Sequence, residues 1–275
     1  MSQVESGLVE VEGARLYYEV RGRGPVLLVG ESGEGHARRS QDLVDQLVDT
    51  YTVVTYDRRG LSRSTPIADG PPATLSVHAD DASQVLAAVT DEPALMLGLS
   101  IGAVIGFHLA VEHPGRLSTL VAFEPVAPWL LPEPLRDRHR DELREIQELY
   151  RLDGVQAAFP KVAEILGIDP AGQDREPDLT PQPMTPERTR NFHHFLEHDF
   201  TAVQVDDLDP KELVRTPTRI VPAAGAATPR HVFDRQCADQ LSELLGVGLT
   251  KFQGGHNANL THPRAFAARL RGVLR

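Results

Sequence analysis

The segment from Ala94 to Val111, which reads ALMLGLSIGAVIGFHLAV, carries no formal charge and limits the fold more than any other part of the chain. Its eighteen residues and evenly spaced glycines would also suit a membrane-spanning helix. The first six residues, however, form a short apolar run after an Asp-Glu-Pro turn, as a buried strand would, and the remainder resembles a buried helix that stops at Pro114. We therefore interpret the segment as a buried strand followed by a buried helix, and we expect no membrane association.

Ser100 stands where the predicted strand gives way to the predicted helix, inside the pentapeptide Gly98-Leu99-Ser100-Ile101-Gly102. A G-x-S-x-G sequence in this context forms a sharp, strained turn, because glycine on both sides allows a close approach of the backbone, and the serine hydroxyl is lifted above the sheet. Serine is a weak nucleophile until a base removes its proton, so a catalytic role requires a histidine from elsewhere in the chain. Ser100 is therefore the candidate nucleophile.

Apolar or β-branched runs alternate with amphipathic stretches on both sides of this segment. The predicted strands are 8–12 and 15–20, which form a hairpin, then 26–29, 52–56, 94–99, 118–123, 218–222 and 247–252. The predicted helices of this part are 36–48, 75–89, 101–113, 230–245 and 263–274. Strands that alternate with helices predict an α/β fold with a mostly parallel central sheet and helices on both faces.

The pattern changes after Glu124, where several prolines interrupt the chain and the next 70 or so residues read as helices. We predict helices over 135–151 and 155–168, a proline-rich loop over 169–186, and a third helix that begins after Thr185 and reaches about Phe200. The chain would then consist of a core, residues 1–124 and 211–275, with an inserted helical cap, residues 125–210. Such a cap is expected over the carboxyl edge of the sheet, where open α/β sheets bind ligands.

His256 is the best candidate for the base among eleven histidines, because it lies in a loop directly after the last predicted strand. His108 falls in the apolar helix, where packing is the better explanation. His193, His194 and His198 share one helix face, but no further cluster of Cys, Asp or Glu supports a zinc site. We expect no metal and no organic cofactor.

Four segments together resemble the α/β-hydrolase superfamily, and within it the small bacterial, actinomycete-like serine hydrolases with a helical cap. These segments are the turn after Val26–Val29, the run Tyr56-Asp57-Arg58-Arg59-Gly60-Leu61-Ser62-Arg63-Ser64, the pentapeptide around Ser100, and Gly254-Gly255-His256. The resemblance covers essentially the whole chain and implies the α/β-hydrolase fold, with Ser100 as nucleophile and His256 as its general base.

The acid of the triad is where this sequence departs from the family pattern. Members commonly carry an Asp after the strand that follows the cap, but the corresponding segment here, Ala223 to Thr228, contains no carboxylate. Glu124 ends the strand after the nucleophile helix, and some members of the superfamily take their acid from this place. We predict that Glu124 orients His256; a structural or substrate-facing role for Glu124 remains open, as does Asp234 as a weaker alternative.

The resemblance also implies an oxyanion hole made by the backbone N–H of Ile101 together with that of Glu31 or Ser32. Glu31 stands where the family more often has glycine, and a carboxylate in the hole would oppose the developing negative charge. Its side chain is therefore expected either to turn away or to serve as an acid or base. Asp57 is expected to fix its own turn by hydrogen bonds to nearby backbone.

These residues predict a hydrolase that cleaves an ester, lactone or related acyl bond of a small, largely apolar molecule. Two alternatives remain: a non-hydrolytic or C–C bond-cleaving enzyme of natural-product metabolism on the same scaffold, and a ligand-binding protein that has lost catalysis. Trp129, Leu130, Phe192 and Phe195 are expected either to line the substrate pocket or to pack the cap on the core.

The composition limits the partners, the disulfides and the location that we expect for this protein. The formal net charge is −11 and no Lys/Arg run is present, so a nucleic-acid partner is not expected. The single cysteine, Cys237, cannot form an internal disulfide and is expected to be packed. Acidic residues near the N-terminus do not fit a signal peptide, so we expect a cytoplasmic location and a small-molecule substrate. The oligomeric state is open, and a homodimer is compatible with the sequence.

Overall fold

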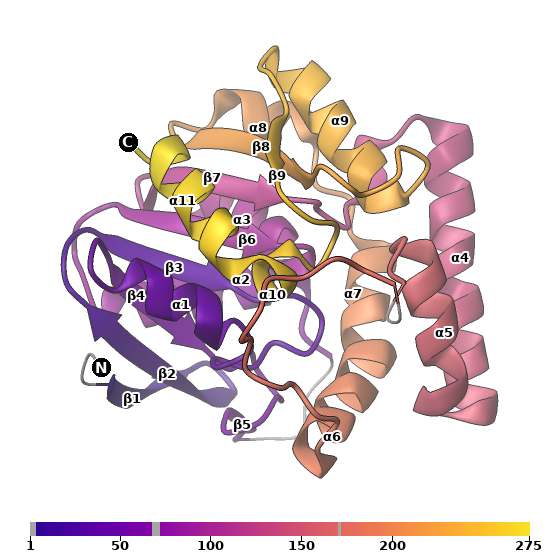
Figure 1. The fold of residues 1–275 in the computed structure, drawn as a ribbon, viewed down its shortest axis with the longest axis horizontal. Helices are drawn as coiled ribbons and strands as arrows, with labels where there is room; N and C mark the ends of the chain where they lie inside the picture. The colour runs from indigo at the N-terminus through magenta and orange to yellow at the C-terminus, as the bar shows by residue number, and fades with distance from the viewer. Residues whose placement is uncertain (1–3, 68–71, 170–171) are drawn as a thin grey trace.

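The computed structural model describes residues 4–67, 72–169 and 172–275 (Figure 1). The first three residues of the acidic N-terminus and residues 170–171 of the predicted proline-rich loop lie outside the described residues. None of the helices within these ranges is long and apolar enough to span a membrane.

The described strands form a nine-stranded sheet in the order β1-β2-β4-β3-β6-β7-β8-β9, with β5 paired to β2. Their bounds are β1 Val4–Val11, β2 Ala14–Gly22, β3 Val26–Gly30, β4 Thr52–Tyr56, β5 Thr65–Pro66, β6 Ala94–Leu99, β7 Leu117–Phe123, β8 Arg219–Gly225 and β9 Thr250–Phe252. β1 and β2 form the predicted antiparallel hairpin, and the six strands from β4 to β9 along the sheet run parallel. The strand order reverses at β3, between β4 and β6, so a ligand site is expected at the carboxyl ends of these strands.

Helices cover both faces of the sheet, as predicted. α1 (Gln41–Leu47) and α11 (Pro263–Val273) lie in front of the sheet in Figure 1, and α2 (Leu75–Ala87) and α3 (Ile101–Glu112) lie behind it. Three buried side chains of α9 (Phe233–Leu245) belong to the same hydrophobic cluster as those of α2 and α3, namely Phe233, Cys237 and Leu241. Two apolar layers therefore enclose the sheet, and their loss from water is the main source of stability for such an architecture.

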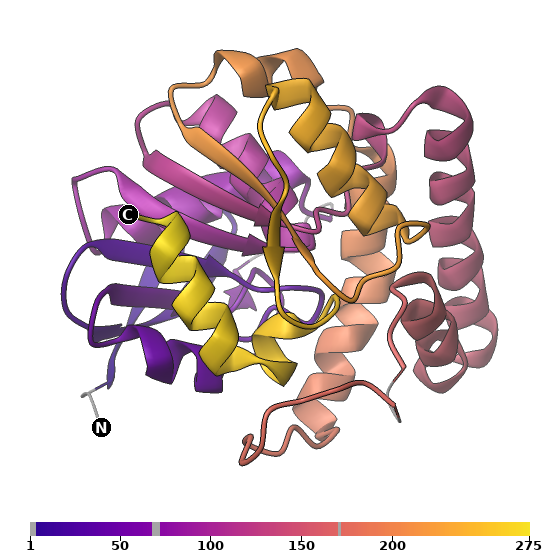
Figure 2. The ribbon, with the colours of Figure 1, turned by 45° about the horizontal axis from the view of Figure 1, so that its top comes forward.

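A group of helices inserted between β7 and β8 lies beside the sheet, beyond the carboxyl ends of its strands (Figures 1 and 2). These are the 3₁₀ turn η1 (Pro128–Leu130), α4 (Glu133–Asp153), α5 (Val155–Ile165), α6 (Pro186–His194), the π-helical turn η2 (Phe195–Asp199) and α7 (Phe200–Val205), which we call the cap helices. The third predicted helix is thus longer than expected, because α6, η2 and α7 follow one another without a break and reach Val205. The next helix, α8 (Pro210–Arg215), packs against α3 and α9 instead.

Some local predictions were wrong. The helix predicted from residue 36 begins only at Gln41, because residues 36–40 form turns and the N–H of Ala37 donates to the Asp57 carboxylate. The last strand starts at Thr250 rather than at 247. α8 and the short helix α10 (Ala258–Thr261) were not predicted, since each is too short to show helical periodicity in the sequence.

The turn between β6 and α3 depends on direct contact between backbones. Gly30, at the end of β3, pairs with Gly98 of β6, and the first turn of α3 crosses over both. A Cβ atom added at Gly102 would lie 2.1 Å from the carbonyl oxygen of Gly30. The glycines of the pentapeptide therefore allow the N-terminus of α3 to lie directly on the end of β3.

Gly102→Ala should destabilise the protein by about 1–3 kcal/mol, since the backbone of β3 cannot move aside as a flexible side chain could. Gly272→Ala is the matched control, because Gly272 lies in the exposed end of α11, where among the described residues no atom beyond its own helix turn and chain neighbours lies within 4 Å of the added Cβ. That change should be neutral or should stabilise by about 0.5–1 kcal/mol. Urea unfolding measures both, and equal effects of the two substitutions would contradict the proposed contact.

Candidate active site

Ser100 occupies the strained turn that its sequence predicts. Its φ of 54° and ψ of −115° lie in a region that non-glycine residues rarely adopt. The backbone N–H of Ser100 donates to the carbonyl of Phe123 at 2.9 Å, so the turn is fixed to the neighbouring strand β7. The side chain lines a cavity between the sheet and the cap helices. A costly backbone conformation is thus held in place at the residue expected to be the nucleophile.

Glu124 adopts a second strained conformation one strand further along. Its φ is 44°, its N–H donates to the carbonyl of Ala223 at 2.9 Å, and its Oε1 accepts the N–H of Gly225 at 2.8 Å. The side chain is fully buried. Ser100 and Glu124 therefore follow the ends of adjacent parallel strands, and each is anchored to the next strand of the sheet.

His256 follows β9 and meets Glu124. Its Nδ1 lies 2.7 Å from Glu124 Oε2, a distance typical of a charge-assisted hydrogen bond. Burial alone would lower the pKa of His256, but the hydrogen bond and charge of Glu124, with the charge of Asp234, raise it above its ordinary value. His256 and Ser100 line the same cavity. The structure thus brings together the three residues that the sequence analysis chose for a triad.

Asp234, the weaker alternative for the acid, is also close to His256. Its Oδ2 lies 3.7 Å from His256 Nδ1, beyond hydrogen-bond distance, whereas Glu124 is 1 Å nearer. Burial raises the pKa of Asp234 to about 7. Because only Glu124 lies within hydrogen-bond distance of the imidazole, the geometry favours Glu124 as the partner of His256.

The segment from Ala223 to Thr228, where the family pattern would place the acid, packs tightly against the loop of His256. Ala226 N–H donates to Phe252 O at 2.7 Å and Ala227 N–H donates to Gly254 O at 2.9 Å. Gly225 also approaches the backbone of Gly255, since a Cβ atom at Gly225 would lie 2.7 Å from it. This end of β8 therefore supports the histidine loop through its backbone, while the carboxylate comes from β7.

The Glu31 side chain is held away from the first turn of α3. Its two carboxylate oxygens accept hydrogen bonds from Ser40 N–H at 3.2 Å and from Ser40 Oγ at 2.9 Å. Burial raises the pKa of Glu31 to about 7. Ser32, rather than Glu31, is among the residues that line the cavity. Of the two expectations for Glu31, the structure therefore agrees with a side chain that turns away.

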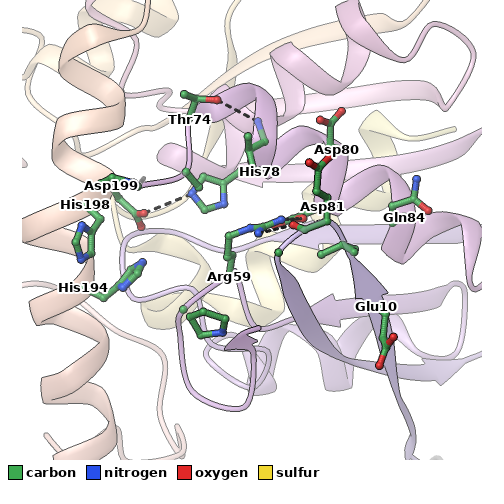
Figure 3. Close-up of a pocket in the computed structure, with 18 residues that line it drawn as sticks. Glu10, Arg59, Thr74, His78, Asp80, Asp81, Gln84, His194, His198 and Asp199 are labelled. Carbon is green, nitrogen blue, oxygen red and sulfur yellow. Dashed lines mark hydrogen bonds and ion pairs between the residues drawn. The ribbon is translucent and has the colours of Figure 1, made fainter. Parts of the chain in front are cut away.

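The loop after β3 is fixed by a buried arginine that the sequence analysis did not single out. Arg58 donates to the carbonyls of Ser32 at 2.9 Å and Gly33 at 2.7 Å, and it pairs with Asp199 of the cap helices at 2.5 Å. Asp199 also lies 3.5 Å from His78 of α2, as Figure 3 shows. Arg58 directly follows Asp57 in a segment already noted, but its partner lies 141 residues away and has no signal in the sequence.

Asp57 fixes its turn as predicted. Within the turn, Oδ2 accepts the backbone N–H of Arg63 at 3.1 Å. Oδ1 accepts the N–H of Ala37 at 2.7 Å, and the two oxygens accept from the Arg63 guanidinium at 2.7 and 3.0 Å. His108 and Cys237, which the sequence analysis also considered, have structural roles. His108 is bound between Glu112 and Asp206, and Cys237 is buried with its thiol on the Ala127 carbonyl. In the described ranges no group of three residues suited to a metal ion is found, although the rings of His194 and His198 are neighbours beside Asp199 (Figure 3).

The cavity has a volume of about 200 Å³ and largely apolar walls. Phe192 and Phe195 line it, as do side chains from every long helix of the cap, among them Leu143, Phe159, Val162, Phe200 and Val203. Trp129 and Leu130 are absent from its lining, so the expectation that they form the substrate pocket is corrected. The Trp129 indole N–H donates to Asp206 at 2.6 Å and its ring packs edge-on against Phe107, which draws the 3₁₀ turn toward α3.

A parallel sheet with a serine at a strand-to-helix turn and a histidine after the last strand defines the α/β hydrolases as a class. A sequence profile of the alpha/beta hydrolase fold matches residues 26–159. The chain is 30% identical to uncharacterized hydrolase YraK of Bacillus subtilis (strain 168), over 98% of this chain and 96% of that protein. It therefore belongs to the α/β-hydrolase family, and the predicted fold class is confirmed.

Solved structures show the same fold at lower identity. An esterase (EaEST) from Exiguobacterium antarcticum has a TM-score of 0.76 and 19% identity, with 96% of this chain and 97% of the esterase covered. The enol-lactonase from Burkholderia xenovorans LB400 has a TM-score of 0.72 and 18% identity, with coverage of 98% and 99%.

Glu124→Gln should lower kcat/KM by about 10²–10⁴, since an amide holds the imidazole less well and does not stabilise its charged form. Because Glu124 raises the pKa of His256, its loss should also move the low-pH limb of the kcat/KM profile to lower pH. Glu112→Gln is the matched control, since Glu112 lies 2.7 Å from Nδ1 of His108 outside the cavity. A pH–rate profile of Glu124→Gln that matches the Glu112→Gln profile would contradict the assignment.

Proposed function

We propose that this protein is a serine hydrolase that cleaves an ester, lactone or related acyl bond of a small, largely apolar molecule. The observation that carries the proposal is the 2.7 Å contact between His256 Nδ1 and Glu124 Oε2 in a cavity that Ser100 also lines. A carboxylate on one nitrogen of a histidine leaves the other nitrogen free to act on a serine hydroxyl. The esterase and enol-lactonase with the same fold are compatible with this chemistry.

In the proposed reaction Ser100 Oγ attacks the acyl carbon while His256 Nε2 takes the hydroxyl proton. The tetrahedral intermediate collapses when His256 returns this proton to the leaving oxygen, and the acyl group remains on Ser100. His256 then takes a proton from water, the resulting hydroxide attacks the acyl-enzyme, and the acid is released with the proton back on Ser100 Oγ. Glu124 holds the imidazole in the productive tautomer and stabilises its charged form throughout.

The negative charge on the acyl oxygen requires donors near the N-terminus of α3. We assign these to the backbone N–H groups of Ile101 and Ser32, since the close approach at Gly102 places the loop after β3 beside this turn. Glu31 contributes at most its backbone, because its carboxyl group is bound to Ser40. Arg58 stabilises the loop by binding its carbonyl oxygens.

The size and lining of the cavity limit the substrate. Its volume of about 200 Å³ is below the ~300–1,000 Å³ of pockets for drug-sized ligands. The bound group is therefore short, and it is apolar where it contacts the phenylalanines of the cap helices. Long lipid chains and polymeric substrates do not fit this description.

Ser100→Ala should lower kcat by about 10⁶, the size of effect expected when the nucleophile of an established triad is removed. A fluorophosphonate should label the native protein and leave Ser100→Ala unlabelled. Ser76→Ala is a suitable control, because Ser76 lies at the start of α2 with its hydroxyl on Glu112. Activity that persists in purified Ser100→Ala would overturn the mechanism, and the absence of labelling in the native protein would favour a binding protein.

A series of p-nitrophenyl esters should show an optimum of acyl length. Each methylene buried in an apolar pocket contributes about 0.8 kcal/mol, so butyrate should exceed acetate in kcat/KM by about tenfold or more. Once the cavity is full, longer chains gain nothing further, and palmitate should be a poor substrate. The hydrolysis seen with Ser100→Ala is subtracted as background. A preference for acetate would contradict the proposed pocket.

A further inference from the structure

Two of the polar side chains that line the cavity, His139 and Asp234, are neighbours of each other. His139 comes from α4 of the cap helices and Asp234 from the first turn of α9 in the core. Both are almost fully buried, with 1% and 2% of their surface exposed. Neither residue is needed for the triad as described above.

These side chains lack the hydrogen bonds that buried polar groups normally have. Within the described ranges, no hydrogen-bond partner is found for either ring nitrogen of His139 or for Oδ2 of Asp234. Their closest approach, from His139 Nε2 to Asp234 Oδ1, is 3.9 Å, which is too long for a direct hydrogen bond. The His139 ring is stacked on Phe233 with 4.0 Å between ring centres, so its orientation is set by packing.

Leaving such groups unpaired is costly. An unsatisfied buried polar group destabilises the folded protein, because the hydrogen bonds that it made with water are not replaced, and each one therefore calls for an explanation. An apolar pair of similar size would pack these positions without that penalty. The arrangement is accounted for if a ligand supplies the missing hydrogen bonds when it enters the cavity.

The protonation states indicate which ligand group fits. Burial lowers the pKa of His139 to about 3, so the imidazole is neutral at pH 7 and offers one N–H donor and one acceptor. Burial also raises the pKa of Asp234 to about 7, with Glu124 contributing in the same direction and His256 opposing it. A pair in which one member is neutral and the other is easily protonated suits a neutral polar group better than a charged one.

We infer that His139 and Asp234 form a subsite for a hydroxyl group carried by the substrate. The hydroxyl oxygen would accept from one nitrogen of His139 while its hydrogen is donated to the Asp234 carboxyl group. An oxygen atom about 2.8 Å from both residues can bridge a gap of 3.9 Å. This inference rests on the proposed function, since it narrows the substrate to a short hydroxylated acyl compound.

The test compares matched esters that differ by one hydroxyl group. In each protein, kcat/KM is measured for p-nitrophenyl 2-hydroxybutyrate and 3-hydroxybutyrate, in both enantiomers. Each value is divided by kcat/KM for the p-nitrophenyl butyrate ester. For at least one hydroxylated ester, the ratio in the native protein should exceed the ratios in His139→Phe and Asp234→Leu by about tenfold or more. Taking ratios removes any general loss of activity or of folded protein caused by the substitution.

Two control variants carry the same kind of change outside the cavity. His193→Phe replaces an exposed histidine of α6, and Asp239→Leu replaces an aspartate on the same helix as Asp234 that pairs with Arg235. Both should keep the ratio of the native protein. If the ratios of His139→Phe and Asp234→Leu equal those of the controls for every hydroxylated ester, the inference is overturned.

A binding experiment separates this inference from the proposed function. If no ester is hydrolysed above the Ser100→Ala background, the proposed function fails, but the subsite can still be tested with amides in Ser100→Ala. NMR titration should then give a Kd for 3-hydroxybutyramide about tenfold or more below that for butyramide, and this difference should vanish when His139→Phe is added. Equal Kd values for the two amides would overturn the subsite independently of catalysis.

Discussion

The contact between the first turn of α3 and the end of β3 is the constraint on which the rest of the site depends. With no side chain at Gly30 or Gly102, the two backbones meet directly, and the chain must turn sharply at Ser100. The same contact brings the loop after β3 beside the start of α3. One short backbone contact therefore determines both the strain at Ser100 and the position of the loop that we propose to stabilise the oxyanion.

Buried ion pairs then connect this loop to the cap helices. Arg58 joins the loop carbonyls to Asp199, and Arg188 of α6 binds Glu34 of the same loop at 2.6 and 2.9 Å. Breaking a buried pair by removing one member typically costs about 3–5 kcal/mol, because the remaining charge has no partner. The position of the cap helices and the conformation of the loop are consequently coupled. The net charge of −11 gives no hint of this, since the relevant charges are paired inside the molecule.

Much of the fold follows from local patterns, because the buried strands of a parallel sheet are short apolar runs and their helices are periodic. Ser100 and His256 were identifiable for a similar reason: Ser100 directly follows a strand, and His256 lies in the loop after the last strand. Glu124 could be proposed only by elimination and through a family resemblance, and its contact with His256 spans 132 residues. Arg58, Asp199 and His139 have no local pattern, since their roles arise from packing between segments far apart in the chain. Trp129 was misplaced because its hydrophobicity does not reveal that its N–H requires Asp206.

The position of the Glu124 carboxylate after β7, rather than after β8, has a structural consequence. Glu124 directly follows β7, where the chain leaves the sheet for the cap helices, and hydrogen bonds at its N–H and its side chain bind it to β8. These two bonds hold the point at which the inserted segment leaves the sheet. The residue in contact with His256 Nδ1 is thus also the one that fixes the start of the inserted segment to the sheet, so a substitution at Glu124 acts on the histidine and on the root of the cap together.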